Sequence, residues 1–523
     1  MRRGFLEIVR FRPAAEWIGW PLLLFVITSC YLASYATHRD LTADEGWQLD
    51  CALRILDGQI QHRDFGSVYT AGRHYLFAGL LAVTGKSLLA IRLTFCLLFG
   101  ISVGLVFAVG RRLMPVSLAG FAAFLVMVVP GPWHKAFYSL ILLLGVYALM
   151  RWRESGLNKW LVVTGVVGGL GAWFRQDNGL FVLIVGLALI VLWALARRGS
   201  EGSGGARRVL VEVASLLLPA VCLLLGVFAF FAFQGAGSAL LTQVFGVAIG
   251  ENAPRSGVAF DALELAIPGL LPFVMPLLSL PVLVWSAFSA WRRRALDDAA
   301  AIRFCLALCC LFAGLQVFRF DVLLRFLQSG PLVYLLGLAL AWRLAAALSA
   351  RPWASRVVVA IGVALPLLLS AMALFDRSSY RMPVEYSGTI AVRFERREPV
   401  DIRGVEFQIT PRWANQLRRL TQFVEDSTEP GEPLLVLGKP SSLYFLTDRL
   451  SPLSIIRPFD RVVARAGRRE IEQTLLDSSC RFVVEDLSFT RRRGKGWRRF
   501  IKRHGKLVGR VGKLIRVWEI ERQ

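Results

Sequence analysis

The sequence is poor in acidic residues, in cysteine and in histidine. Its 523 residues include 37 Asp and Glu against 61 Lys and Arg, eight Cys and five His, for a net charge of +24. Only Cys51 and Cys480 lie away from apolar segments. Two unpaired thiols are the favoured interpretation, and one disulfide between them is the alternative. The chain also lacks a glycine-rich nucleotide loop and an internal repeat of fixed period, so neither nucleotide binding nor a repeat architecture is supported.

Three of the five histidines lie in one polar stretch, residues 37–79, which also contains Asp44. These are His38, His62 and His74. Their spacing matches no short metal-ligand motif. No metal site is therefore favoured, and a divalent cation is the alternative.

Apolar residues, in contrast, are abundant. They make up 55% of the chain, and the mean hydropathy is +0.54, which is more than one soluble core can bury. Apolar runs long enough to cross a bilayer as helices recur through the first 375 residues. We expect eleven spans, near 17–36, 87–109, 114–130, 136–150, 160–174, 179–196, 209–233, 266–291, 302–318, 327–342 and 357–375. The first is long and no cleavage site follows it, so we interpret it as an uncleaved anchor.

Basic residues orient these spans, because short cytoplasmic loops collect Lys and Arg. With the N-terminus in the cytoplasm, every second loop is basic and falls on the same side. The residues concerned are Arg111, Arg112, Arg151, Arg153, Lys159, Arg197, Arg198, Arg207, Arg208, Arg292 to Arg294, Arg343, Arg351 and Arg356. The first long loop, 37–86, and all residues after 375 then lie outside the cytoplasm.

Residues 376–523 have a mixed, soluble composition. "EPLLVLG", "CRFVVEDL" and "LIRVWEIE" read as strands, and "KPSSLYFLTDR" leads from the first of them into a helix. The sequence thus predicts an α-helical polytopic membrane protein with a transmembrane core, 1–375, and a C-terminal extracytoplasmic α/β domain, 376–523.

The polar stretch begins with a helix signal. "TADE" matches a capping box in which Thr42 caps a helix and Glu45 reaches back to its amide, and the helix is expected to run to about Asp57 before Gly58. The capping box does not account for Asp44. This carboxylate is kept ionised by the positive end of the helix dipole, so it can accept a proton or orient a hydroxyl.

An acidic pair in the first outer loop, followed by an aromatic and glycine-containing stretch, resembles the GT-C superfamily of membrane glycosyltransferases. Here the pair is Asp44-Glu45, and the stretch is "YTAGRHYLFAGLLAVTGKSLLAIR", residues 69–92. Within it, "Y-x-x-G-x-x-Y" and "G-x-S-L-x-x-x-R" are similar to the protein mannosyltransferase and aminoarabinose transferase group, which includes lipopolysaccharide glycosyltransferases. "GKPSSLYFLTDR" is similar to C-terminal segments of that group.

This resemblance implies an enzyme at the outer face of the plasma (inner) membrane. Its donor would be a sugar on a polyprenyl phosphate, and its acceptor a hydroxyl of an envelope glycolipid, polysaccharide or protein. Asp44, with Glu45, would form the catalytic pair, and transfer would invert the anomeric centre. Among acceptors, a glycolipid or polysaccharide is slightly favoured over protein because the outer domain is basic.

Cations would stabilise the departing phosphate. Relatives often carry prolines where this chain has Ala71 and Gly72, and some carry a phosphate-binding lysine near Thr70, which is missing here. The candidate substrate-binding residues are Arg63, Tyr69, Arg73, His74, Lys135, Arg175, Arg319 and Arg325.

Each candidate also has a structural interpretation. Local ion pairs are an equally good interpretation of Arg175 with Asp177 and of Arg319 with Asp321. Arg54 can pair with Asp50 at i,i+4 spacing. Aromatic residues such as Tyr69 collect at membrane interfaces in any case.

The basic segment "RRRGKGWRRFIKRHGK", residues 491–506, has three interpretations. It could bind anionic membrane lipids or a phosphorylated glycolipid acceptor, or it could be a solvated face. Nucleic acid is not expected outside the cytoplasm.

Two other functions remain open. A flippase or transporter of lipid-linked saccharides would explain the spans, and it predicts polar residues or broken helices near the bilayer midplane. A noncatalytic binder of such saccharides predicts that Asp44 is dispensable.

Overall fold

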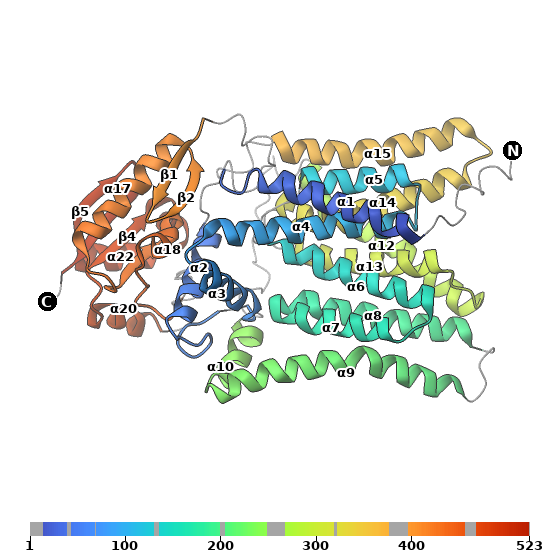
Figure 1. The fold of residues 1–523 in the computed structure, drawn as a ribbon, viewed down its shortest axis with the longest axis horizontal. Helices are drawn as coiled ribbons and strands as arrows, with labels where there is room; N and C mark the ends of the chain where they lie inside the picture. Colours follow the sequence, from blue (N-terminus) through green and yellow to red (C-terminus); the bar gives the residue numbers. More distant parts are fainter. Residues whose placement is uncertain are drawn as a thin grey trace.

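The computed structural model describes residues 14–38, 43–67, 69–129, 135–198, 204–247, 267–317, 322–375, 396–455 and 467–521. A long helical bundle occupies one end of the molecule and a domain built on a sheet occupies the other (Figure 1). Two helices of the first loop, α2 (Ala43–Leu56) and α3 (Gly72–Thr84), lie between them (Figure 1). The predicted fold class is therefore confirmed. The boundary predicted after residue 375 falls where 376–395 lie outside the described residues, and it stays a prediction.

The helices of the bundle coincide with the apolar runs of the sequence. They are α1 (Ala14–Ala33), α4 (Leu88–Gly110), α5 (Val116–Val128), α6 (Ala136–Ser155), α7 (Lys159–Phe174), α8 (Gln176–Arg197), α9 (Gly204–Phe233), α12 (Ile267–Arg292), α13 (Asp298–Val317), α14 (Val322–Ala347) and α15 (Pro352–Phe375). Among the described residues, seven helices are long and apolar enough to cross a membrane, and three more are shorter apolar helices. A count of eleven crossings stays a prediction.

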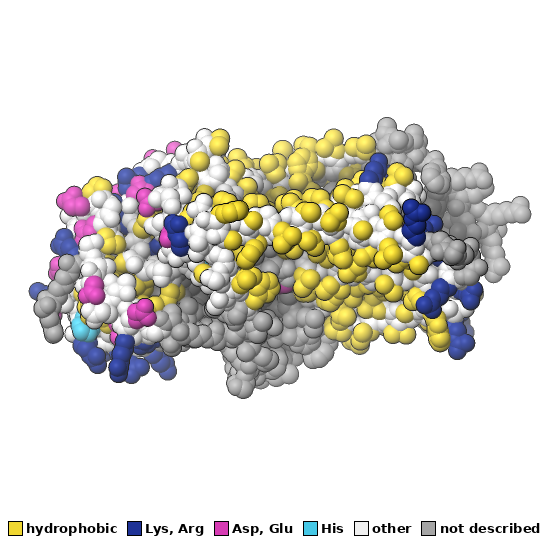
Figure 2. All heavy atoms as spheres, turned by 90° about the horizontal axis from the view of Figure 1, so that it is seen from below, with side chains coloured by type: hydrophobic (Ala, Val, Ile, Leu, Met, Phe, Trp, Pro, Cys, Tyr) yellow, Lys and Arg dark blue, Asp and Glu magenta, His cyan; other side chains and the backbone are white. Residues whose placement is uncertain are grey.

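The surface of the bundle has the distribution expected of a membrane protein. In Figure 2 a hydrophobic band covers the bundle, and Lys and Arg gather at both ends of the molecule. The loops predicted to be cytoplasmic meet at the end of the bundle away from the sheet domain. There Arg112 pairs with Glu154 at 3.1 Å, and Arg153 pairs with Asp298 at 2.9 Å. This grouping agrees with the predicted alternation of loops, and which end faces the cytoplasm stays a prediction.

Helix α4 is seated closely against α1. A Cβ atom at Gly100 would lie 2.8 Å from the Phe25 carbonyl oxygen, and one at Gly104 would lie 2.9 Å from the Pro21 carbonyl oxygen. Small residues four apart let two helix backbones approach in a membrane. This contact fixes the helix whose first turns carry Arg92.

The C-terminal domain has two sheets. Strands β3 (Leu434–Leu437), β4 (Phe482–Asp486), β6 (Ile515–Ile520) and β5 (Gly505–Val511) form one sheet in that order, with β3 and β4 parallel and the other pairs antiparallel. The three strands expected from the sequence are β3, β4 and β6. Strands β1 (Glu398–Ile402) and β2 (Val405–Ile409) form a hairpin. Its two turn residues, Arg403 and Gly404, both have positive φ, as a tight hairpin turn requires.

Helices cover this sheet. They are α17 (Pro411–Ser427), η4 (Lys439–Ser441), α18 (Ser442–Thr447), α20 (Arg468–Asp477), α21 (Leu487–Arg493) and α22 (Lys495–His504). The basic segment 491–506 lies largely on α22, whose Trp497, Phe500 and Ile501 are buried. Its exposed side chains include Lys495, Arg499, Lys502 and Arg503. The helix is thus amphipathic with an exposed basic face, and the three interpretations of that face stay predictions. Cys51 and Cys480 are both buried, and no disulfide joins them among the described residues.

Candidate active site

The two acidic residues that begin α2 have different surroundings. Glu45 is buried, and its two carboxylate oxygens accept hydrogen bonds from Nε and Nη2 of Arg92 at 3.0 and 3.1 Å. Arg92 also donates from Nη1 to the carbonyl of Ala36, in the turn that follows α1, at 2.9 Å. Glu45 therefore ties α2 to α1 and α4. The predicted capping box needs Thr42, which lies outside the described residues.

Asp44 precedes this ion pair by one residue and is half-buried in the first turn of α2. The geometry therefore separates the pair. Glu45 is committed to holding the helix, whereas Asp44 retains access to solvent at the helix N-terminus, where a carboxylate is stabilised.

The structure explains the motif "G-x-S-L-x-x-x-R" around α4. Gly85 has a φ of 69°, which a side chain disfavours, and it ends α3. The Ser87 hydroxyl accepts a hydrogen bond from the Ala90 amide at 3.1 Å and so caps α4. The motif ends in Arg92. Turn, cap and arginine together bring one guanidinium to Glu45.

The predicted i,i+4 pair of α2 is confirmed. Nε of Arg54 lies 3.2 Å from Oδ2 of Asp50, and both side chains are buried. Burial raises the pKa of Asp50, an effect that the Arg54 charge partly offsets. This pair lies more than a turn beyond Asp44, on the part of α2 that meets the C-terminal domain.

A buried polar network crosses the loop between α2 and α3. Gln61 accepts a hydrogen bond from His74 Nδ1 at 2.7 Å and donates to the Tyr69 carbonyl at 3.0 Å and to His62 Nε2 at 3.1 Å. His62 Nδ1 in turn lies 2.8 Å from Oε1 of Gln243, in the short π-helix η3 (Thr242–Val247). The network thus ties the loop to the segment after α9.

His62 is held in this network against its backbone preference. Its φ is 73°, an uncommon conformation for a residue with a side chain, and burial lowers its pKa. The network also occupies His74, a candidate for substrate binding. Among the described residues no group of three or more His, Cys, Asp or Glu is arranged to hold a metal ion.

Three candidates come together where α3 meets the junction of α7 and α8. The buried Arg73 guanidinium lies over the Tyr69 ring, 5.0 Å from its centroid. Tyr69 also interacts electrostatically with Arg175. Gly72 makes this approach feasible, because a Cβ there would lie 2.7 Å from the Trp173 carbonyl oxygen.

Arg175 itself is built into the junction. Its Nε lies 2.6 Å from Oδ1 of Asp177, and its Cζ lies 3.8 Å from the centroid of the Tyr138 ring. The local ion pair considered from the sequence therefore exists. Nη2 also donates to Oδ2 of Asp177 at 2.8 Å, so both this pair and the Tyr138 ring hold the guanidinium.

The remaining candidates are dispersed or undescribed. Arg63 is exposed, pairs with its neighbour Asp64 at 2.9 Å and donates to the Gln234 carbonyl at 3.3 Å. Lys135 is half-buried at the start of α6. Arg319 and the side chain of Arg325 lie outside the described residues.

An apolar groove of about 410 Å³ lies next to the segments that carry Arg73 and Arg175, which we term the cationic cluster. Tyr75 of α3 and Trp173 of α7 line its end, and the rest comes from α9: Cys222, Leu223, Gly226, Val227, Phe230 and Phe231. Gly72 packs against Trp173, which also lines the groove. The groove therefore adjoins the segment that carries Arg73.

Residues 72–201 match the family model described as dolichyl-phosphate-mannose-protein mannosyltransferase. This match confirms the predicted resemblance to the GT-C mannosyltransferases over the segment that it covers. The segment includes α3, the Arg92 motif, and the junction that carries Arg175. No curated protein sequence matches the chain significantly.

Two solved structures are similar to this chain at low identity. One is the archaeal oligosaccharyltransferase AglB from Archaeoglobus fulgidus, in complex with an inhibitory peptide and a dolichol-phosphate, with 12% identity and a TM-score of 0.47 over 90% of this chain and 70% of that chain. The other is ArnT from Cupriavidus metallidurans bound to undecaprenyl phosphate, with 14% identity and a TM-score of 0.48 over 97% of this chain and 98% of that chain.

Some residues of the site were not assigned a role from the sequence. Arg92 was part of the quoted motif, and the signal for its role was an arginine in an otherwise apolar segment, where a charge needs a partner. Gln61 and Gln243 gave no signal, because a single amide in a polar loop is ordinary and their contacts join distant segments.

Proposed function

We propose that this protein is an integral membrane glycosyltransferase that moves a sugar from a polyprenyl-phosphate donor to an acceptor hydroxyl of the cell envelope. The observation that carries the proposal is the match of residues 72–201 to a family named for a polyprenyl-phosphate sugar donor. Those residues include Arg73 and Arg175 of the cationic cluster, and Trp173, which lines the apolar groove.

The groove and the cluster suit the two parts of such a donor. The apolar groove of about 410 Å³ can accommodate the first isoprene units. Arg73 follows Gly72, which packs against the groove residue Trp173, and Arg175 lies two residues after Trp173. Their guanidinium groups would contact the phosphate, since arginine offers paired donors to phosphate oxygens.

Asp44 is the proposed catalytic carboxylate. It would accept the proton of the acceptor hydroxyl as that oxygen attacks the anomeric carbon, while the bond from this carbon to the phosphate oxygen breaks. The polyprenyl phosphate leaves with both electrons of that bond, and the arginines offset its charge. Attack opposite the leaving group inverts the anomeric centre.

The acceptor is proposed to be a glycolipid or polysaccharide of the envelope, with a protein hydroxyl as the other class. We place the reaction at the outer face of the plasma membrane, with the N-terminus in the cytoplasm. This follows from the basic loops gathered at the opposite end of the bundle.

The test is sugar transfer by the purified, full-length protein from a panel of radiolabelled polyprenyl-phosphate sugars. We expect release from at least one donor, with the product anomer opposite to that of the donor by NMR. Absence of transfer from every donor, with lipid binding retained, would favour the transporter or the noncatalytic binder instead.

A further inference from the structure

Helix α2 contacts the C-terminal domain very close to Asp44. Gly46 is buried, and a Cβ atom there would lie 2.6 Å from the Ser442 amide nitrogen and 2.8 Å from the Ser441 carbonyl carbon. These are backbone atoms at the junction of η4 and α18, and both serines are buried. The domain backbone therefore rests on α2 two residues after Asp44, where only glycine fits.

A second contact holds the other end of α2. Besides its pair with Asp50, Arg54 donates from Nη2 to the carbonyl oxygens of Ser451 and Leu453, at 2.7 and 3.3 Å. The guanidinium is buried, so each of these charged hydrogen bonds replaces water. The residues joined are almost 400 positions apart in sequence.

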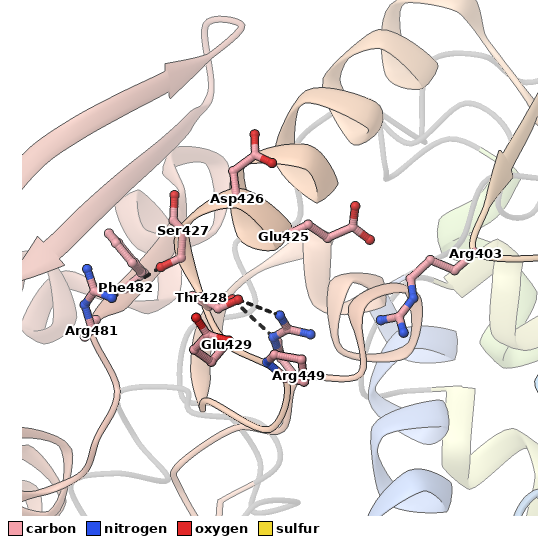
Figure 3. A pocket seen from close by; sticks show the side chains of 10 residues that line it. Arg403, Glu425, Asp426, Ser427, Thr428, Glu429, Arg449, Arg481 and Phe482 are labelled. Carbon is pink, nitrogen blue, oxygen red and sulfur yellow. Dashed lines mark hydrogen bonds between the residues drawn. The ribbon is translucent and has the colours of Figure 1, made fainter.

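The carbonyls that Arg54 binds belong to one short segment, Thr447–Leu453, which we term the strap. The domain holds the strap from its other side. The Thr447 carbonyl accepts hydrogen bonds from Arg403 and Arg449, and Arg449 donates in addition to the hydroxyl and carbonyl of Thr428 (Figure 3). Arg403 and Arg449 also line a polar cavity of about 580 Å³.

The strap has a third link to the membrane part. Asp448 pairs with Arg403 at 3.2 Å and with Lys86, which lies between α3 and α4. The strap is thus tied to the sheet domain by Arg403 and Arg449, and to the first loop by Arg54 and Lys86.

We propose that the C-terminal domain is a positioning element for Asp44, acting through Gly46, Arg54 and the strap. This inference rests on the proposed function, in which Asp44 is the catalytic carboxylate. The bundle holds the α2 N-terminus through Glu45 and Arg92, and the domain contacts the same helix at Gly46 and Arg54. Gly46 and Arg54 are positioning residues, since neither is proposed to touch substrate.

The inference predicts a separation of kinetic constants. Adding a methyl group at Gly46 must displace α2 or the domain backbone. A shift of about 1 Å in a catalytic group costs on the order of a hundredfold in rate. The donor is proposed to bind in the bundle, so its KM should not change.

The experiment compares Gly46→Ala with Gly79→Ala in the full-length protein. Gly79 lies in α3 with open space around its missing side chain, so it controls for a methyl group added to a helix of the same region. We expect Gly46→Ala to lower kcat by about tenfold to a hundredfold with KM for the donor unchanged, and Gly79→Ala to behave as wild type. A wild-type kcat for Gly46→Ala would overturn the inference.

A second variant tests the same contact without any activity. Arg54→Lys keeps a charge opposite Asp50, but a single ammonium cannot replace the separate Nε and Nη2 contacts. We expect faster amide hydrogen exchange in residues 44–56 and in the strap. Unchanged exchange in both segments would contradict the inference. If the wild type transfers no sugar, the proposed function fails, and this exchange measurement still decides whether the domain holds α2.

Discussion

The two ends of the helical bundle use arginine in different ways. At the end away from the sheet domain, several arginines join separate helices, although Arg151 and Arg208 also pair within their own helices. Arg153 of α6 pairs with Asp298 of α13, and Arg197 of α8 pairs with the buried Glu212 of α9 at 3.0 Å. At the end that carries α2 and α3, Arg63 and Arg175 pair with carboxylates one and two residues away.

We interpret this difference as a separation between charges that hold helices together and charges that are proposed to meet a ligand. A pair between neighbours in sequence does little for the fold, because the chain already holds the two residues together. At the α2 end Arg92 and Arg54 make buried long-range contacts like those of the other end. We therefore expect Arg92 and Arg197 both to stabilise the fold, and Arg175 to act differently from both.

The largest effect on stability should come from the pairs that join helices. Arg92→Met removes the guanidinium that binds the buried Glu45 carboxylate, whereas Arg197→Met leaves the buried Glu212 with Arg208, which pairs with it at 3.2 Å. Breaking one side of a buried pair costs about 3–5 kcal/mol. We expect Arg92→Met to lose roughly this much free energy of unfolding, and Arg197→Met to lose less because Arg208 remains, both measured by chemical denaturation in detergent.

Arg63→Ala is the matched control. This arginine is exposed, and its ion pair is with the adjacent Asp64. Its unfolding should match that of the wild type. Equal stability of Arg92→Met and wild type would remove the distinction between the two kinds of arginine.

Arg175→Lys should separate activity from stability at the α2 end. Lysine keeps the charge but cannot stack on Tyr138 as a planar guanidinium does. We expect transfer to fall by about a hundredfold, as on loss of one group that stabilises developing charge, with near wild-type unfolding. A variant that unfolds as readily as Arg92→Met would show that Arg175 is structural.

The smallest effect should come from the apolar groove. Gly226 of α9 lines it and has open space around its missing side chain, so Gly226→Leu would fill the groove. We expect KM for the donor to rise by about tenfold, which corresponds to displacing roughly two methylene groups at about 0.8 kcal/mol each.

Gly120→Leu provides the control, because Gly120 of α5 also has open space and lies outside the groove. It should leave KM unchanged. Equal KM values for Gly226→Leu and wild type would place the donor elsewhere.

The sequence was informative where local pattern decides structure. Apolar runs located the helices of the bundle, alternation located β3, β4 and β6, and i,i+4 spacing predicted the pair of Asp50 and Arg54. Each of these features depends on residues within a few turns of one another, and periodicity reports on such neighbours.

The rest depended on packing between distant segments. Glu45 meets Arg92 only because Gly100 and Gly104 let α4 approach α1, and 47 positions separate the two partners. Gln243 meets His62 across 181 positions. No local pattern encodes such pairings. From the sequence, Glu45 was therefore interpreted as a capping or catalytic residue, and Arg92 was assigned no role.

The central claim is that Asp44 carries the chemistry while its neighbour Glu45 carries the fold. The most direct measurement is the single-turnover rate of sugar transfer by Asp44→Asn, with its free energy of unfolding measured in parallel. The account predicts a loss of about 10²–10⁴ in rate, as for a removed general base, with wild-type stability. A folded Asp44→Asn protein that transfers sugar at the wild-type rate would contradict it.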